Sequence, residues 1–451
     1  MNQITIQSSV APLTRRDFLR TTSTAAATTA VLGSLAIERA AHAAGDDELK
    51  LALIGCGGRG SGATDQALST KGKVRLVALA DVFPDTLQKS LENLKQQHAA
   101  KVDVPPDRQF IGFDAYKQAI ALADVVVLGS PPGFRPDHFA EAVKQGKHVF
   151  MEKPVACDAP GVRKMLAAAE ESKKKNLKVV VGLQRHYQPG YIEIMKRIHD
   201  GMIGEILALR CYWNEAGVWV NKREDLEKQY GRPLTEMEYQ MRNWYYFVWL
   251  SGDHIVEQHV HNIDVCNWAK KAYPVRCQGM GGHEVRRGKD FGEIFDHHAV
   301  EFEYADGVRM FSYCRHIRGC WNSVSEHAVG TKYNADLSGA VIRDPRDKNK
   351  IIWRYRAEVP VNPYQAEHDQ LFDAIRNDKP LNDAENGTRS TMSGIMGRMA
   401  TYSGQIITLD DAMESEINLM PDKLAWDATP KVLPDQDGLY PVAVPGKTIA
   451  V

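Results

Sequence analysis

The sequence predicts an α/β fold in which an N-terminal doubly wound parallel sheet precedes a C-terminal α+β domain with an open, mainly antiparallel sheet. Three observations support this fold class. An apolar run of strand length, residues 49–54, leads directly into a glycine-rich loop. Strand-like and helix-like segments then alternate up to about residue 185, as they do in parallel sheets. Beyond residue 190, strand-like segments follow one another with turn signals between them.

The composition indicates a globular protein whose partner is a small molecule. The chain has 451 residues, of which 43% are hydrophobic and 25% charged, and its formal net charge is −1. A charge so close to zero, without basic blocks, argues against binding to nucleic acid or to an anionic membrane. The seven cysteines form no CxxC pair and no zinc spacing, so we expect buried thiols and no disulfide framework.

Residues 1–43 have the pattern of a twin-arginine export signal. Arg15 and Arg16 precede a Thr- and Ala-rich, weakly apolar run, and Ala41-His42-Ala43 is a small-x-small cleavage site. A membrane anchor is the alternative, but the run is short and rich in hydroxyl groups. The pattern therefore predicts a folded, periplasmic protein with no membrane span after cleavage near Ala43.

The glycine-rich loop after the first strand predicts a Rossmann dinucleotide-binding domain over residues 44–185. Gly55, Gly57 and Gly60 fit G-x-G-x-x-G, in which backbone N–H groups meet a pyrophosphate at a helix N-terminus. The next strand ends in Asp81, 21 residues after Gly60, where an acid binds ribose hydroxyls and repels a 2′-phosphate. This favours NAD over NADP as the cofactor; the alternative for Asp81 is a cap or turn residue.

Ligands of doubly wound sheets bind at the carboxyl ends of the strands. The strands "DVVVLGSPP" and "HVFMEKP" and the last strand, "LKVVVGLQRHYQP", end in polar residues. The residues that we expect around the cofactor, besides those already named, are Gly58, Arg59, Ser130, Pro131, His138, Glu152, Lys153 and Gln184.

Residues 186–365 are predicted to form the α+β domain, which binds substrate and mediates oligomerisation. "EYADGVRMF" predicts a hairpin at Asp306-Gly307. Residues 366–415 are expected to be helical and to pack back across the domains, and the proline-containing residues 416–451 to run extended over the surface.

The stretch "SGDHIVEQHVHNIDVCNW", residues 251–268, predicts a polar helix stripe. A helix capped by Asp253 and continuing to Ala269 would place His254, Glu257, His261, Asp264 and Trp268 on one side and apolar residues opposite. His259 would lie near the buried edge and make a structural hydrogen bond. His254 and His261 are seven residues apart, about 10 Å along a helix, so no metal site is predicted, although an ion on Glu257 and His261 stays open.

The glycine loop, Glu152-Lys153-Pro154 and the helical His261-x-x-Asp264 together resemble the family of glucose-fructose oxidoreductase, inositol dehydrogenase and MocA (Gfo/Idh/MocA). The resemblance spans nearly all of the chain after the signal. It implies that Lys153 lies beside the nicotinamide and substrate and that His261 serves in acid–base catalysis. Two positions depart from the family pattern: Glu257 replaces the usual aspartate four residues before the histidine, and His259 replaces a glycine.

Oxidation of a secondary alcohol needs a base for the hydroxyl proton, which favours His261, or Lys153 if its surroundings make it a base. We expect Glu257 or Asp264 to orient the imidazole. The alternative is a solvated helix face with a surface lysine.

Two aromatic segments, "CYWNEAGVWV" and "MRNWYYFVWL", could stack on a sugar ring, with ordinary aromatic packing as an equal alternative. The residues expected to contact substrate are Arg185, His186, Trp213, Asn214, Arg242, Trp244 and His254, with Trp219, Asn243 and Tyr245 as further candidates.

Three functions remain open from the sequence. The first is an NAD-dependent oxidoreductase acting on a sugar, polyol or glycoside, with Lys153 and His261 in acid–base roles. The second is a glycoside hydrolase that oxidises its substrate transiently with recycled NAD, and the third is a non-catalytic nucleotide- or sugar-binding protein. The resemblance also implies a homo-oligomer, a dimer or tetramer, joined through the open sheet.

Overall fold

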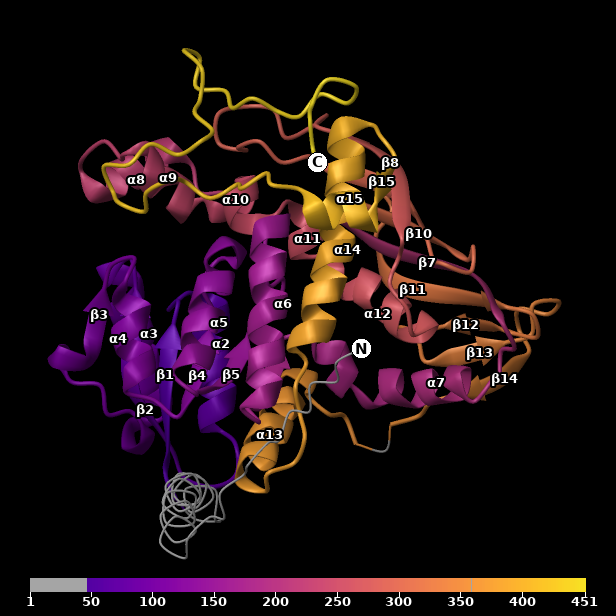
Figure 1. Cartoon of the computed structure of the whole chain (residues 1–451), viewed down its shortest axis with the longest axis horizontal. Helices are drawn as coiled ribbons and strands as arrows, with labels where there is room; N and C mark the ends of the chain where they lie inside the picture. Colours follow the sequence, from indigo (N-terminus) through magenta and orange to yellow (C-terminus); the bar gives the residue numbers. More distant parts are fainter. Residues whose placement is uncertain (1–46, 358) are drawn as a thin grey trace, which may run out of the picture.

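The computed structural model describes residues 47–357 and 359–451, which form two sheets with helices between and around them (Figure 1). The predicted export signal, residues 1–43, lies outside the described residues. In the part of the chain that is described, no helix is both long and apolar enough to cross a membrane.

The N-terminal sheet is parallel and six-stranded, in the order β3-β2-β1-β4-β5-β6. Its strands are β1 (Leu49–Ile54), β2 (Val74–Asp81), β3 (Gln109–Ile111), β4 (Val125–Leu128), β5 (His148–Met151) and β6 (Val179–Val181). The helices that connect them are α2 (Gly58–Leu68), α3 (Pro84–Gln97), α4 (Ala115–Ala121), α5 (Arg135–Lys144) and α6 (Ala159–Lys174). This confirms the predicted doubly wound sheet.

Alternating side chains of these strands belong to two separate cores, as burial on both faces requires. Leu51 and Leu53 of β1 pack with residues of α2 and α3, whereas Ala52 and Ile54 pack with residues of α4, α5 and α6. Because the six strands are parallel, the loops that follow their carboxyl ends all leave the sheet at one edge.

The second sheet has nine strands in the order β14-β13-β12-β11-β7-β10-β9-β8-β15. Only β10 and β7 pair in parallel and the other neighbours are antiparallel, which confirms the predicted open sheet. The strands are β7 (Ile206–Glu215), β8 (Arg276–Gly282), β9 (His297–Glu303), β10 (Arg309–His316), β11 (Ser323–Gly330), β12 (Asn334–Asp336), β13 (Val341–Arg343), β14 (Ile351–Arg354) and β15 (Ile407–Thr408). The predicted hairpin joins β9 to β10 around Gly307.

Helices, among them α6, lie between the two sheets and around them (Figure 1). Those of the C-terminal part are α7 (Pro189–His199), α8 (Arg223–Tyr230), α9 (Glu236–Arg242), α10 (Val248–Ser251), α11 (His254–Glu257), α12 (Val260–Lys270), α13 (Pro363–Arg376), α14 (Ala384–Ser403) and α15 (Leu409–Glu414). Helix α13 contacts α2, and α14 contacts both α6 and β8. Residues 415–451 form neither helix nor strand.

The single polar helix predicted for residues 254–269 is wrong, because the chain breaks between α11 and α12. Asp253 has a φ of 73° and its carboxylate caps His254 N–H. At the break, Gln258 Oε1 lies 2.7 Å from His316 Nε2, and His259 Nε2 lies 2.8 Å from Ser312 Oγ. These contacts with the second sheet interrupt the helix at Gln258 and His259.

Candidate active site

A cavity of about 680 Å³ lies at the carboxyl ends of the parallel strands. The first domain contributes the glycine loop and the ends of β2, β4 and β5, and the second contributes β7, α11 and α12. The predicted site residues that line this cavity are Gly55, Gly57, Gly58, Arg59, Asp81, Ser130, Pro131, His138, Glu152, Lys153, Trp213, Trp219, Arg242, Trp244, Glu257 and His261.

The glycine loop is shaped for a ligand on one side and for close packing on the other. A Cβ on Gly55, whose φ is 86°, would lie 2.3 Å from Ser130 N, and a Cβ on Gly60 would lie 2.0 Å from Gly55 O. Gly57 and Gly58 have open space where a Cβ would be, at the N-terminus of α2. Backbone N–H groups are thus open to a phosphate, which fits the pyrophosphate of a dinucleotide.

Asp81 lies at the end of β2, where the ribose of such a ligand would be bound. Its two carboxylate oxygens accept Cys56 N–H at 2.7 Å and Phe83 N–H at 2.8 Å. Burial raises the pKa of this carboxyl, while the backbone donors lower it. Asp81 therefore has two roles: its carboxylate holds the backbone of Cys56 and Phe83 in place, and it also lines the cavity.

Arg59 and Glu152 form an ion pair that joins the glycine loop to the end of β5. Arg59 Nε donates to Glu152 Oε1 at 3.0 Å, and the guanidinium lies over the Tyr364 ring at 4.8 Å. Ser130 Oγ lies 3.0 Å from His138 Nδ1, and burial lowers the pKa of His138 to about 3, so this imidazole is neutral.

Lys153 reaches across the cavity from β5 to α11. Its Nζ donates to the backbone carbonyl of Glu257 and lies 3.0 Å from Glu257 Oε1. Both side chains are about 12% exposed, so the pair is largely shielded from solvent and anchored on two domains.

His261, in the first turn of α12, lines the same cavity. Its ring stacks against Trp213 of β7, with centroids 6.0 Å apart and planes 22° apart. Burial, reinforced by the positive charges of Lys153, Arg185 and Arg59, lowers its pKa well below the ordinary value. His261 is therefore a neutral imidazole. Its Nδ1 has no hydrogen-bond partner among the described residues.

The expectation that Asp264 orients the His261 imidazole is wrong. Asp264 Oδ2 lies 2.6 Å from His186 Nε2, and its Oδ1 accepts the hydroxyl of Ser390 at 2.8 Å. The break before α12 directs this carboxylate toward η4 (Gln184–Tyr187) and α14 instead. Glu257 pairs with Lys153 rather than with the imidazole.

Several residues predicted to bind substrate or cofactor lie outside the cavity lining. Arg185 forms a buried ion pair with Glu326, at 2.6 Å, and His186 is held by Asp264 and stacks on Trp268. His254, the first residue of α11, is fully buried. Asn214 and Gln184 are also absent from the lining, and Gly60 packs against the Gly55 carbonyl instead of lining the cavity.

Arg242 lines the cavity but at its Asp81 end. Its guanidinium lies 3.8 Å from the centroid of the Phe83 ring and forms an ion pair with Asp85.

The cavity is also lined by residues that no local sequence motif predicted. Arg135 is fully buried and donates to the carbonyls of Ser130 and Pro154, which braces the ends of β4 and β5. Other unpredicted lining residues are Phe113, Tyr116, Asn221, Leu226, Met241, Gln258 and Tyr364. Tyr364 comes from α13, almost two hundred residues after the last parallel strand, and no local pattern signals its position.

The fold and this cavity define a dinucleotide-binding class of protein. Comparison with known proteins specifies it further: residues 49–182 match the model of GFO_IDH_MocA, described as an oxidoreductase family with an NAD-binding Rossmann fold. Over these residues the chain is similar to the Gfo/Idh/MocA family, and its N-terminal domain is an NAD-binding Rossmann domain.

The similar proteins include inositol dehydrogenases. The inositol 2-dehydrogenase of Ralstonia nicotianae is 26% identical over 314 residues, which cover 66% of this chain and 81% of that protein. The inositol 2-dehydrogenase/D-chiro-inositol 3-dehydrogenase of Halalkalibacterium halodurans is 32% identical over 167 residues, 36% of this chain and 43% of that protein.

Solved structures share the fold at low identity. Aldose-aldose oxidoreductase from Caulobacter crescentus, complexed with glycerol, has a TM-score of 0.61 at 18% identity, covering 80% of this chain and all of that chain. Scyllo-inositol dehydrogenase from Lactobacillus casei, with bound NAD(H) and scyllo-inositol, has a TM-score of 0.57 at 18% identity, covering 81% and 100%.

Proposed function

We propose that this protein is an NAD-dependent oxidoreductase that acts on a secondary hydroxyl of a sugar or cyclic polyol. The observation that carries the proposal is the convergence of Lys153 and His261 in the cavity that also contains the open side of the glycine loop. Alcohol oxidation by hydride transfer needs a base for the hydroxyl proton, which a neutral imidazole can be, and a nearby cation stabilises the oxygen that loses the proton.

The cofactor residues have distinct roles in this proposal. Gly57 and Gly58 offer backbone N–H groups to the pyrophosphate, and Asp81 accepts the ribose hydroxyls. Bound NAD would supply the hydride acceptor, and side chains of the protein transfer the proton and stabilise the charge on the substrate oxygen.

The neutral imidazole of His261 accepts the proton of the substrate hydroxyl as its carbon is oxidised. The ammonium of Lys153 donates a hydrogen bond to the same oxygen and stabilises the negative charge that develops there. Glu257 holds the ammonium in place through its carbonyl and carboxylate oxygens. Trp213, stacked on His261, offers an apolar face to the ring of the substrate.

The relatives support the substrate class. Two of the similar proteins are inositol dehydrogenases, and one similar structure contains scyllo-inositol, a ring in which every carbon carries a hydroxyl. An exposed Trp219 and the neighbouring Trp244, with ring centroids 5.9 Å apart, extend the aromatic lining of the cavity.

The test is to incubate the purified protein with NAD and a panel of cyclic polyols, free sugars and aryl glycosides, following NADH absorbance and product release together. NADH that accumulates with a ketone product supports the proposal. Aglycone release without NADH accumulation would replace it with a glycosidase that recycles its cofactor. Binding without any turnover, unchanged in Lys153→Met, would make the protein a non-catalytic binder.

We further propose that the protein is exported by the twin-arginine pathway to the periplasm. The support is the Arg15-Arg16 pair followed by the weakly apolar run and the Ala-x-Ala site. Replacing both arginines by lysine should leave the full-length precursor in the cytoplasmic fraction, whereas wild-type protein is recovered from the periplasm shortened by about 43 residues.

A further inference from the structure

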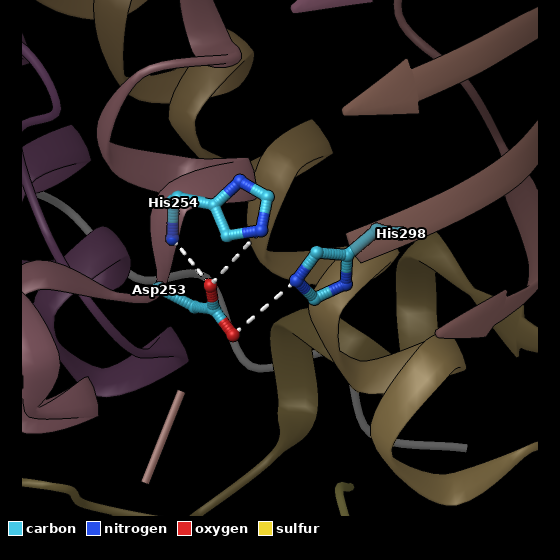
Figure 2. Close-up of side chains that lie close together, drawn as sticks. All are labelled: Asp253, His254 and His298. Carbon is cyan, nitrogen blue, oxygen red and sulfur yellow. Dashed lines mark hydrogen bonds and ion pairs between the residues drawn. The ribbon is translucent and has the colours of Figure 1, made fainter. Parts of the chain in front are cut away.

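Behind the catalytic cavity lies a second cluster of titratable groups, which the proposed reaction does not use. Asp253 and His254 at the start of α11 meet His298 of β9, and all three side chains are fully buried (Figure 2). Asp253 Oδ2 lies 3.3 Å from His298 Nε2, and Asp253 Oδ1 lies 3.9 Å from His254 Nε2. One potential ligand atom from each residue lies within 4.8 Å of the others.

The His254 ring has no hydrogen bond at either nitrogen, although it is fully buried. A buried polar group without a partner costs about 1–3 kcal/mol, so such groups in native proteins call for a ligand or another explanation. Both ring nitrogens of His254 are therefore available to a ligand.

The other two residues are already oriented by the protein. His298 Nδ1 lies 2.9 Å from Thr401 Oγ1, which leaves Nε2 facing Asp253. Asp253 Oδ2 accepts the hydroxyl of Tyr402 at 2.6 Å and the N–H of Phe295 at 3.0 Å, so the carboxylate is fixed from α14 and from the chain before β9. Outer hydrogen bonds of this kind usually orient metal ligands.

We propose that Asp253, His254 and His298 bind one divalent transition-metal ion, of the zinc class, in the interior of the C-terminal domain. Two imidazoles and a carboxylate are a ligand set that suits Zn²⁺. Zinc bonds of about 2.0–2.2 Å bring tetrahedral ligands to roughly 3.4 Å from one another. The present spacing therefore closes by rotation of side chains, chiefly of the unpaired His254 ring.

Three protein ligands leave the fourth tetrahedral position to a water molecule. The ion would join α11 to β9 close to the cavity. Glu257, which holds Lys153, lies one turn after His254 on α11. Gln258, which lines the cavity, contacts His316, and the His316 ring stacks on His254 at 4.4 Å. A metal on His254 would thus fix the segment that carries the partner of the catalytic lysine.

The spacing rule used on the sequence missed this cluster for a clear reason. It compared His254 with His261 on one helix, whereas the third ligand, His298, comes from a strand of the second sheet. Only the tertiary structure brings it next to Asp253.

The experiment is to produce the full chain in zinc-supplemented medium, because the buried site fills as the chain folds, and to measure bound metals by mass spectrometry after brief chelation. The proposal predicts about one zinc per chain, and a cobalt-grown sample with the visible absorption bands of tetrahedral Co²⁺. Total transition metal below about a tenth of an equivalent in folded wild-type protein overturns it.

Variants locate the ion. His254→Ala should lower the metal content at least tenfold and abolish the cobalt bands, whereas His297→Gln, at the neighbouring partly exposed position of β9, should keep both. If His254→Ala fails to fold, His298→Asn serves as the second test. One equivalent of metal retained in a folded His254→Ala protein would mean that the ion binds elsewhere, and would overturn the assignment.

Discussion

Lys153 Nζ lies 3.0 Å from Glu257 Oε1, and this ion pair joins the end of β5 in the NAD-binding domain to α11 in the second domain. Lys153 also donates to the backbone carbonyl of Glu257, so its position depends on the path of α11 as well as on charge. Glu257 reaches the lysine from a short, separate helix. The position of the Lys153 ammonium is therefore set by both domains.

Lys153→Met should lower kcat at least 100-fold and leave NAD binding within about threefold, because the change removes a group that acts on the reacting oxygen. The measurement is steady-state kinetics combined with titration of NAD by fluorescence. Lys144→Met, which changes an exposed lysine on α5, is the matched control and should behave as wild type. Unchanged kcat in Lys153→Met would remove this residue from the mechanism.

Glu257→Gln tests the ion pair itself. Glutamine keeps the backbone carbonyl and a side-chain acceptor but loses the negative charge, so we expect a smaller fall in kcat, about tenfold, with KM for NAD unchanged. A loss as large as that of Lys153→Met would show that charge, and not position, dominates the role of Glu257.

The pH dependence of alcohol oxidation should reflect the lowered pKa of His261. Because its pKa lies below the ordinary 6.5, the imidazole stays neutral, and able to accept a proton, as the pH falls through 7. We therefore expect kcat/KM to remain level from pH 8 to pH 6.5 and to fall only below that range. His261→Asn, which cannot act as the base, should lower kcat by about 10²–10⁴. An acid limb centred above pH 7 that persists in His261→Asn would contradict this assignment.

Asp81 should control the choice between NAD and NADP. Asp81→Asn removes the negative charge that repels a 2′-phosphate and keeps an acceptor for the N–H of Cys56 or Phe83, so the glycine loop is preserved better than in an alanine variant. We expect the ratio of kcat/KM for NAD to that for NADP to fall at least tenfold, about 1.4 kcal/mol. Equal ratios in wild type and variant would mean that Asp81 serves the loop alone.

The cofactor half of the site was predictable from the sequence because it depends on local order. Parallel strands end at one edge of the sheet, so residues at or just after the end of a strand, such as Asp81, Ser130 and Lys153, are brought to the cavity by the order of the elements alone. The glycine spacing likewise specifies a turn that only close backbone approach requires, as the Gly55–Ser130 contact illustrates.

The substrate half was less predictable, because tertiary contacts override helical periodicity there. The stripe over residues 254–268 assumed one continuous helix, but Gln258 and His259 are drawn to β10 and β7, and Asp264 turns to His186. Tyr364 reaches the cavity only because α13 packs against α2. Neither the break in the helix nor the packing of α13 on α2 can be predicted from the local sequence.

The outer face of the nine-stranded sheet should form the interface of a homo-oligomer, which the sequence predicted as a dimer or tetramer. Helices α12 and α14 contact one face, and the other presents Tyr212, Tyr313 and the exposed Trp321, with Tyr212 stacked 5.6 Å from Tyr313. Exposed aromatic clusters of this kind are typical of interfaces. Tyr313→Glu combined with Trp321→Glu should shift the mass measured by light scattering to that of a monomer. Ile449→Glu, at an exposed position of the tail, is the control. A monomeric wild-type protein at tens of micromolar would contradict the prediction.

His368 should make the NAD-binding domain sensitive to acid. Its ring is fully buried on α13 against Phe150, with centroids 4.1 Å apart, and neither nitrogen has a hydrogen-bond partner in the described part of the chain. Burial lowers its pKa to about 3, whereas the unfolded chain protonates near 6.5. The unfolded state therefore binds a proton that the folded state does not, and stability is lost as the pH falls from 6.5 toward 3.

At pH 5 the unfolded-state pKa lies 1.5 units above the pH, which corresponds to about 2 kcal/mol of lost stability from this one residue. His368→Leu has similar volume, keeps the contact with Phe150 and cannot titrate. We expect the free energy of unfolding in urea to fall by about 2 kcal/mol less between pH 7.5 and pH 5 in this variant than in wild type, whatever its value at pH 7.5. An equal loss in both proteins would show that His368 is protonated in the folded state as readily as in the unfolded chain.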